Sequence, residues 1–406
     1  MDDQEDDDLG LPRTLEEDAP PKVIVRRVPK RDAGPGGGRK LTLESPIRNP
    51  GEKTWEIGEK LQKDLDGEDD DVAPLIHPAQ EIQTPGRVVS VWGAASTDLD
   101  RFKPCLARKP MNFEGDFSTM RHSVGVMSHR GLKPDSPNQD DFFILSRPER
   151  LLVGVLDGHG PDGHDVSHFG QENLPKLLVE HLRAQLEGDW SEAVTSVFAK
   201  LVAQAKQDIP DKAQRSGSTV SMLSLDQQDG REDNPLRLRG AFVGDSSMVH
   251  AWKPQGGQWE WEMLTNIHKP DRPDEAARIA AAGGKVQPAS SKDTTARLMT
   301  PEWNLAMSRS FGDFHASPYG LSSVPEVIKE RTLDASCEHL ILLCSDGVWD
   351  VIPPGQAVNL VGRYRPGEAQ KAAEKLVSKA EIRWQETEDV VDDITVILIR
   401  PVLDPQ

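Results

Sequence analysis

Short apolar runs separated by turn residues dominate the chain from about residue 120 onward. Their length and their content of β-branched and aromatic residues predict strands at residues 123–128, 142–145, 151–156, 219–225, 236–243, 248–252, 261–264, 340–344 and 394–399. Apolar positions at helical spacing predict helices at residues 173–186, 191–207, 273–282, 354–363 and 368–380. The strands are joined by short links and the helices come in pairs, a pattern that favours antiparallel sheets over a doubly wound parallel sheet. We predict an α+β fold with a central sandwich of two antiparallel β-sheets flanked by pairs of α-helices.

The first part of the chain lacks this pattern. Residues 1–117 alternate between acidic blocks, a basic segment at residues 22–31 and a Gly/Pro/Arg stretch, without a sustained apolar period. Too little apolar surface is present there to offset the loss of chain entropy on folding. We therefore divide the chain into an acidic, largely disordered N-terminal extension (1–117) and a folded domain (118–406), with Trp55 and residues 88–92 as candidates for a short docked element. The basic segment is either a docking or nuclear-targeting signal or, as we favour, a solvated tail that pairs with the acidic blocks.

Composition narrows the class of protein. The 406 residues carry a formal net charge of −19, and such a surface repels nucleic acid and anionic lipid. No apolar run approaches the roughly 20 residues that a membrane span needs. The start Met-Asp-Asp-Gln has the pattern of neither a signal peptide nor a myristoylation site. We expect a monomeric intracellular protein, cytoplasmic or also nuclear, with no nucleic-acid partner and no membrane insertion. Cys105, Cys337 and Cys344 lack zinc-site spacing and are expected to be free thiols, with Cys344 inside a buried strand.

Acidic residues stand at the ends of several predicted strands. Asp157 follows the run LLVGVL, Asp245 ends AFVGD, Asp346 ends LILLCSD, and Asp392 and Asp393 precede ITVILI. A carboxylate at the rim of a buried strand is partly desolvated and needs a partner of opposite charge. Any one of these residues alone is explained as a turn Asp that bonds to nearby backbone. The whole set, with no Arg or Lys nearby in sequence, indicates a divalent cation bound by hard oxygen ligands, Mg²⁺, Mn²⁺ or Ca²⁺ rather than zinc.

An ordered series of motifs carries a specific resemblance. The segments SHRGLKPDSPNQDDFF, GVLDGHGPDG, SGSTV, AFVGDSS, HKPDRPDEAARIAAAGGKV, NLAMSRSFGD, VPEV, LLCSDGVWDV and DDITVI occur in the order found in the metal-dependent protein phosphatase 2C family. The resemblance covers about residues 120–401. It implies a phosphoserine/phosphothreonine protein phosphatase, a signalling hydrolase whose partners are phosphoprotein substrates. It also implies two Mg²⁺ or Mn²⁺ ions, and a third that binds more weakly, at one end of the sandwich.

The same resemblance implies a role for each matched residue. Asp157 resembles the ligand that bridges both metals, and the Gly158 carbonyl resembles a ligand of one of them. His159 resembles the general acid. The further metal-associated acids are Asp346 and Asp392 at the first metal, Asp140 near the second, and Asp245, with help from Asp350, at the weaker third metal.

These roles are chemically consistent. Two divalent ions facing the three carboxylates of Asp157, Asp346 and Asp392 keep a positive charge that attracts a phosphate dianion. A water shared by two metals is acidified to hydroxide near neutral pH and can attack phosphorus in line. The departing alkoxide needs a proton, and His159, two residues from Asp157, is placed to give it. No covalent phosphoenzyme is needed.

Two positions depart from the family's pattern. Gln139 stands where the family commonly has Glu, which bears on the affinity for the second metal, and Asp135 stands where it commonly has an Arg that clamps the substrate phosphate. Lys133 or Arg130 can take over that role, as a point charge or a fork respectively, and Lys133 is slightly favoured. The departures motivate a rival of another class, a phosphatase-like scaffold that binds phosphoproteins without turnover. Manganese-dependent turnover of a phosphate ester distinguishes the two.

A zinc hydrolase is a second rival. His164 and His168 have the i, i+4 spacing of zinc ligands on a helix. The flanking Gly163 and Gly170 disfavour a rigid helix there, so we expect two exposed histidines after a loop.

For three further arginines the sequence evidence for binding phosphate is weaker. Arg309 is expected to brace the strand and loop near Asp313 rather than to bind phosphate. Arg272 and Arg278 lie in a segment that resembles the family's flap beside the active site, and we expect them to form salt bridges on a helix surface.

Overall fold

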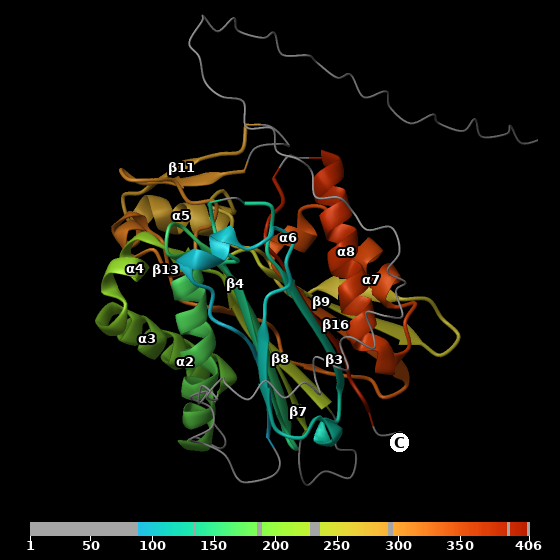
Figure 1. Cartoon of the computed structure of the whole chain (residues 1–406). Coiled ribbons are helices and arrows are strands. Elements are labelled where there is room, and N and C mark those ends of the chain that lie inside the picture. The colour runs from blue at the N-terminus through green and yellow to red at the C-terminus, as the bar shows by residue number, and fades with distance from the viewer. Residues whose placement is uncertain are drawn as a thin grey trace, which may run out of the picture. The chain divides into compact units, whose positions relative to one another are not determined.

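Two antiparallel β-sheets lie at the centre of the described chain, and helices cover the outer side of each (Figure 1). The computed structural model describes residues 88–133, 135–184, 189–227, 236–290, 295–387 and 390–403. The predicted N-terminal extension up to residue 87, with Trp55 and the basic segment at residues 22–31, lies outside the described residues. The predicted α+β sandwich is confirmed.

The larger sheet has the strand order β14-β8-β7-β5-β4-β1-β2, and short strands β6, β13 and β15 extend it. Its strands are β1 (Val89–Gly93), β2 (Met111–Glu114), β4 (Asp140–Arg147), β5 (Arg150–His159), β6 (Gly217–Ser218), β7 (Val220–Gln227), β8 (Leu236–Val243), β13 (Phe311–Gly312), β14 (Glu326–Val327) and β15 (Arg331–Thr332). The smaller sheet has the order β10-β9-β16-β17-β3. Its strands are β3 (Ser123–His129), β9 (Ser247–Pro254), β10 (Glu260–Met263), β16 (Cys337–Cys344) and β17 (Ile394–Arg400). A separate ribbon pairs β11 (Lys285–Gln287) with β12 (Arg297–Met299).

The helices cover the two outer faces in pairs. On the larger sheet lie α2 (Gly163–Ala184) and α3 (Trp190–Asp208), and on the smaller sheet lie α7 (Pro354–Val361) and α8 (Ala369–Thr387). The remaining helical segments are α4 (Pro210–Arg215), α5 (Pro273–Ala281), α6 (Asp346–Trp349), η2 (Asp98–Phe102), η3 (Phe117–Thr119), η4 (Phe314–Tyr319) and η5 (Pro366–Glu368). Among the described residues, no helix is both long enough and apolar enough to cross a bilayer.

The sequences of the central strands are continuous apolar runs because both faces of these strands are buried. On β16, Ile341 and Leu343 face the core between the sheets, whereas Leu340 and Leu342 face the core beneath α7 and α8. Successive side chains of a strand point to opposite faces, so one run supplies two cores. Cys344 ends this strand as a buried free thiol, and Cys105 and Cys337 are also free, as predicted.

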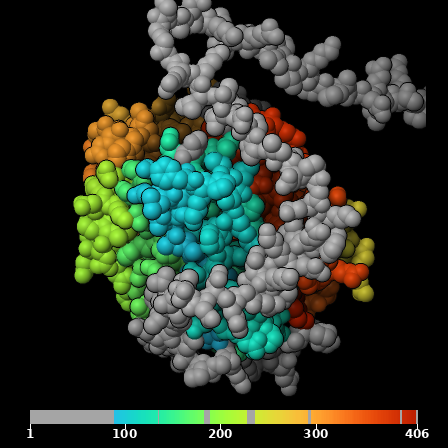
Figure 2. Space-filling model, viewed as in Figure 1, coloured from blue at the N-terminus to red at the C-terminus, as the bar shows by residue number. Residues whose placement is uncertain are grey.

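Residues 88–117, part of the extension on the sequence alone, belong to the folded unit. β1 pairs with β4 and with β2, and every residue of β1 is buried. Figure 2 shows this first described segment, coloured blue to cyan, on the face between the green and the red parts of the chain. The run at 88–92 docks as we expected, and it carries a second strand with it. A five-residue strand gains its stability from the neighbour it pairs with, so its own pattern is too short to mark a domain boundary.

Helix α2 starts at Gly163, ten residues before the predicted start, which corrects the expectation for His164 and His168. Both histidines lie on this helix rather than after a loop, and His164 is buried. Tertiary packing outweighs the low helix propensity of Gly163 and Gly170, because the helix packs Val166 against the larger sheet.

Candidate active site

Acidic residues from both sheets meet at one end of the sandwich. Asp140 opens β4 and lies directly opposite Asp157 of β5. From the smaller sheet, Asp346 follows β16 and opens α6, and Asp392 precedes β17. Burial and then the negative charges of Asp346, Asp140, Asp392 and Asp245 raise the pKa of Asp157 well above its usual range. The structure therefore brings these five acids within electrostatic reach of one another.

The cluster holds more negative charge than its protein surroundings neutralise. Burial, followed by the charge of Asp393, raises the pKa of Asp140 to about 7. Burial and the charge of Asp392 raise the pKa of Asp346 well above its usual range, although Asp346 shares a hydrogen bond with Asp157. Carboxylates held this close favour binding of cations, because a cation removes both the repulsion and the cost of desolvation.

Two lysines pair with acids of the cluster. The Lys133 ammonium donates to Asp392 and lies 3.8 Å from Asp393 Oδ2. The Lys269 ammonium donates to Asp245 Oδ2 at 2.6 Å. Burial alone would lower the pKa of each lysine, but the neighbouring carboxylates raise it, so both stay charged. Lys133 was predicted here, whereas Lys269 was missed because it lies 24 residues from Asp245 in sequence.

The other candidate phosphate-binding residue, Arg130, has a different task, which corrects the prediction. It is buried, and its guanidinium donates to four backbone carbonyls, those of Asp100, Lys103, Lys133 and Ser136. Those bonds hold the β3–β4 loop in shape, so the guanidinium donors of Arg130 are already used by backbone carbonyls. Asp135 lies exposed in the same loop.

Gln139 is buried and acts as a donor. Its Nε2 donates to the carbonyl of Gly160 at 2.8 Å, and its backbone carbonyl accepts from Gly158 N at 3.1 Å. A Glu at this position could not donate the first of these bonds. The amide therefore ties the β3–β4 loop to the segment that follows His159.

His159 forms a close pair with an acid that the sequence analysis did not assign to the site. Its Nε2 lies 2.6 Å from Asp313 Oδ2, which also accepts from Ser310 Oγ at 2.7 Å. Burial would lower the pKa of His159, but the charge and hydrogen bond of Asp313 raise it. A Cβ at Gly217 would lie 2.0 Å from Asp313 Oδ2 and 2.7 Å from His159 Nε2, so only glycine leaves room for the pair. A left-handed backbone at Asp313, with φ of 49°, is the local feature that sets this residue apart.

The donor set fits hard divalent cations. All candidate ligands are oxygen atoms, and the Oδ1 atoms of Asp140 and Asp245 are buried without a hydrogen-bond partner in the described part of the chain. Gly158, whose carbonyl is a candidate ligand, lies buried in β5 between Asp157 and His159. Within the described residues, no three Asp, Glu, His or Cys side chains converge as a ready-made ligand shell. The lysine ammoniums lie against Asp392 and Asp245, so cation binding there has to shift them. Asp350, at the end of α6, contributes to the field that raises the pKa of Asp346.

The flap segment is held by a buried ion cluster around Glu275 of α5. Arg309 Nη2 and Arg278 Nη1 each donate to Glu275 Oε1 at 2.7 Å. Arg309 also donates to the carbonyl of Val324, and Arg272 pairs with Asp274 and Glu326. Arg309 therefore has a bracing role, but it joins α5 to the segment at Val324 rather than bracing the loop near Asp313. Arg272 forms the predicted salt bridges at the helix surface, whereas Arg278 pairs with a buried carboxylate.

The two histidines of the zinc alternative do not form a site with each other. His168 Nδ1 lies 2.8 Å from Asp141 Oδ2, and the nearest acids to His164 Nε2, Asp165 and Asp98, lie at 3.5 and 3.7 Å. Each ring therefore lies against carboxylates around α2 rather than against the other histidine.

Comparisons with known proteins show the family of the chain. The profile described as Protein phosphatase 2C matches residues 114–389. "Probable protein phosphatase 2C 72" of Arabidopsis thaliana is 32% identical over 298 residues, which cover 68% of this chain and 85% of that protein. "Probable protein phosphatase 2C 48" of Oryza sativa subsp. japonica is 31% identical, covering 68% and 83%. The crystal structure of the serine-threonine phosphatase 2C from Toxoplasma gondii shares the fold, with a TM-score of 0.57 and 21% identity over 69% of this chain and 94% of that chain. The chain therefore belongs to the protein phosphatase 2C family and is a metal-dependent protein serine/threonine phosphatase.

Proposed function

We propose that this chain hydrolyses phosphoserine and phosphothreonine in proteins with two Mg²⁺ or Mn²⁺ ions bound by the acid cluster and with His159 as the general acid. The observation that carries the proposal is the group of acids that meet from both sheets, three of which, Asp140, Asp157 and Asp346, have pKa values raised by burial and by the charges of neighbouring carboxylates. Asp157 and Asp346 are the principal ligands of this proposal, with Asp140, Asp392 and the Gly158 carbonyl beside them. Asp245 is the proposed ligand of a weaker third ion.

The bound cations would supply an acidified water as the nucleophile and neutralise the charge of the phosphate. Lys133 and Lys269 pair with Asp392 and Asp245, two of the proposed ligands, so a carboxylate that held a cation would leave its lysine free to add positive charge near the phosphate. The pairing of Lys133 with the cluster makes it the better candidate for holding the substrate phosphate, whereas the donors of Arg130 are committed to backbone carbonyls.

His159 is the proposed acid because it directly follows the proposed ligands Asp157 and Gly158, and because Asp313 raises the His159 pKa that burial alone would lower. Asp313 pairs with Nε2, whereas Nδ1 is buried without a hydrogen-bond partner among the described residues, so Nδ1 is the nitrogen that we propose as the donor to the leaving oxygen. An alkoxide such as that of serine has a high pKa and needs a proton in the transition state, whereas an aryl oxide leaves without much help.

The test compares two classes of ester. His159→Ala should reduce kcat for a phosphothreonine peptide by about 10²–10⁴-fold, the usual contribution of a general acid, and reduce kcat for an aryl phosphate much less. Ser191→Ala, at the exposed start of α3, is the matched control. Equal losses for both ester types would contradict the role of His159 as acid, and no turnover by the wild type with either metal would favour the scaffold alternative.

A further inference from the structure

Asp140, at the start of β4, lies beyond the part of β4 that pairs with β1. The pairing of β1 with β4 ends at Trp92 opposite Phe143, three residues short of Asp140. The first residues of β4 therefore lack a strand partner on that side. A main-chain carbonyl buried without a donor is costly, so another group has to supply the bond.

Lys109 supplies it. Its ammonium donates to the main-chain carbonyl of Asp140 at 2.5 Å and lies 3.4 Å from Asp141 Oδ2. The side chain of Lys109 is only 2% exposed and that of Asp141 is fully buried. Burying an ammonium of this kind is expensive unless it is paired and hydrogen-bonded, so these two contacts account for its place inside the protein.

The backbone of Lys109 is fixed to the other sheet. Lys109 N donates to Ser128 O of β3, and its neighbour Arg108 bridges to His129. β3 belongs to the smaller sheet and β4 to the larger one. One side chain thus links the two sheets at the end where Asp140 and Asp157 of the larger sheet meet Asp346 and Asp392, which flank strands of the smaller one.

The contact between Lys109 and Asp141 is tightly packed, and a side chain at Gly93 would not fit beside it. A Cβ at Gly93 would lie 2.1 Å from Asp141 Oδ1 and 3.0 Å from Lys109 Cε. Gly93 and Lys109 both precede residue 114, where the match to the family profile begins. The segment that precedes the matched region therefore supplies Lys109, which contacts Asp140 of the acid cluster.

We propose that Lys109 is a positioning residue for the metal centre, which holds the Asp140 main chain and keeps the acids of the two sheets in register. The inference rests on the proposed function for the identity of the centre. Lys109 donates to the main-chain carbonyl of Asp140 and not to its carboxylate, so it acts through Asp140.

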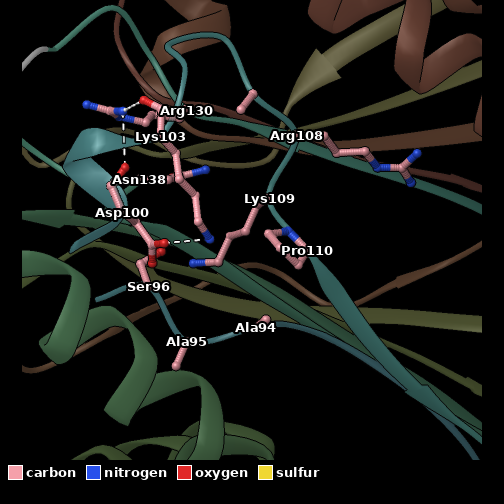
Figure 3. Close-up of a pocket in the computed structure, with 11 residues that line it drawn as sticks. Ala94, Ala95, Ser96, Asp100, Lys103, Arg108, Lys109, Pro110, Arg130 and Asn138 are labelled. Atoms are coloured by element: carbon pink, nitrogen blue, oxygen red, sulfur yellow. Dashed lines mark hydrogen bonds and ion pairs between the residues drawn. The ribbon is translucent and has the colours of Figure 1, made fainter. Parts of the chain in front are cut away.

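A small pocket of about 50 Å³ gives access to this lysine (Figure 3). Lys109 extends into it beside the ion pair of Lys103 with Asp100, which measures 2.6 Å. Arg108 points away from the pocket. Lys103 is 60% exposed and its ammonium pairs with Asp100 of η2 rather than with β4, so it serves as a matched control lysine in the same pocket.

The experiment measures Mn²⁺ binding by calorimetry on the full chain, in Lys109→Met and Lys103→Met, at a temperature where melting curves show both to be folded. We expect Lys109→Met to weaken Mn²⁺ binding by tenfold or more and Lys103→Met to change it less than twofold. Partial unfolding would lower the number of sites and not their affinity, so an affinity change separates positioning from a general structural role. An affinity of Lys109→Met within twofold of the wild type would overturn the inference. Wild-type protein that binds Mn²⁺ without hydrolysing phosphopeptides would contradict only the proposed function.

A second variant covers the case in which Lys109→Met does not fold. In Lys109→Ala, n-propylammonium entering through the pocket should restore folding and Mn²⁺ affinity, and n-butanol of similar size should not. Equal effects of the amine and the alcohol, or no effect of either, would show that the ammonium has no positioning role.

Discussion

We predict that removing the charge of Asp140 from the acid cluster makes the metal-free protein more stable. The pKa of Asp140 is about 7 in the folded chain against 3.8 for an ordinary Asp. A folded-state pKa above the unfolded one means that stability is present at low pH and is lost as pH rises from about 4 through 7. Because one pKa unit corresponds to about 1.4 kcal/mol, ionising Asp140 costs the folded state about 4 kcal/mol at pH 8 and about 1.5 kcal/mol at pH 5.

Asp140→Asn keeps the shape of the side chain and the acceptor for Ser345 Oγ, which now donates to Asp140 Oδ2 at 2.8 Å. We therefore expect this variant to raise the free energy of unfolding in EDTA by up to about 4 kcal/mol at pH 8, and by about 1.5 kcal/mol at pH 5. Urea denaturation at the two pH values measures the difference. Asp211→Asn, an exposed carboxylate in α4, is the control and should change stability by less than about 0.5 kcal/mol.

Adding Mn²⁺ should reverse the order, because the wild type gains a ligand that the variant lacks. Asp140→Asn that is no more stable than the wild type in EDTA at pH 8 would refute the reasoning. So would a gain that is the same at pH 5 and pH 8, since the advantage would then not come from a titrating carboxylate.

Further predictions concern the flap, the phosphate site and the loop behind His159. The arginines around Glu275 hold its pKa at about 2 against burial, so the stability that this carboxylate contributes is present above pH 4.5 and is lost as pH falls toward 2. Glu275→Gln should therefore lower the free energy of unfolding by about 3–5 kcal/mol in urea denaturation at pH 7. A loss below about 1 kcal/mol would contradict a structural role of this cluster in the flap. Lys133→Gln should raise KM for a phosphothreonine peptide more than it lowers kcat in steady-state kinetics, and an unchanged KM would exclude this lysine from phosphate binding. Gln139→Glu loses the bond to the Gly160 carbonyl and adds a charge to the cluster, so its melting temperature in EDTA should fall by several degrees; a rise would count against the donor role of the amide.

The sequence predicts the sandwich and most of its acids because both depend on local patterns. Each central strand is an apolar run, and Asp157, Asp346 and Asp392 are adjacent to such runs. The positions of β16 and β17 could therefore be read directly, together with the acids at their ends.

Contacts between distant parts of the chain could not be predicted in this way. Asp313 is 154 residues from His159, and its role depends on a left-handed turn that brings it to the ring. Lys269 reaches Asp245, and Lys109 reaches Asp140, only once the sheets are assembled. The first ten residues of α2 were missed for a related reason, since a helix that begins at Gly163 is stabilised by packing and not by its own propensity.

Phosphate release from a phosphothreonine peptide, titrated with Mn²⁺ and Mg²⁺, tests the central claim most directly. The wild type should turn over the peptide with either metal, should stop when a chelator is added, and should show no comparable turnover with Zn²⁺. Asp157→Asn should fold and yet lose nearly all activity. Metal-independent turnover, or a folded wild type that is inactive at every metal concentration while Asp157→Asn behaves identically, would contradict the account.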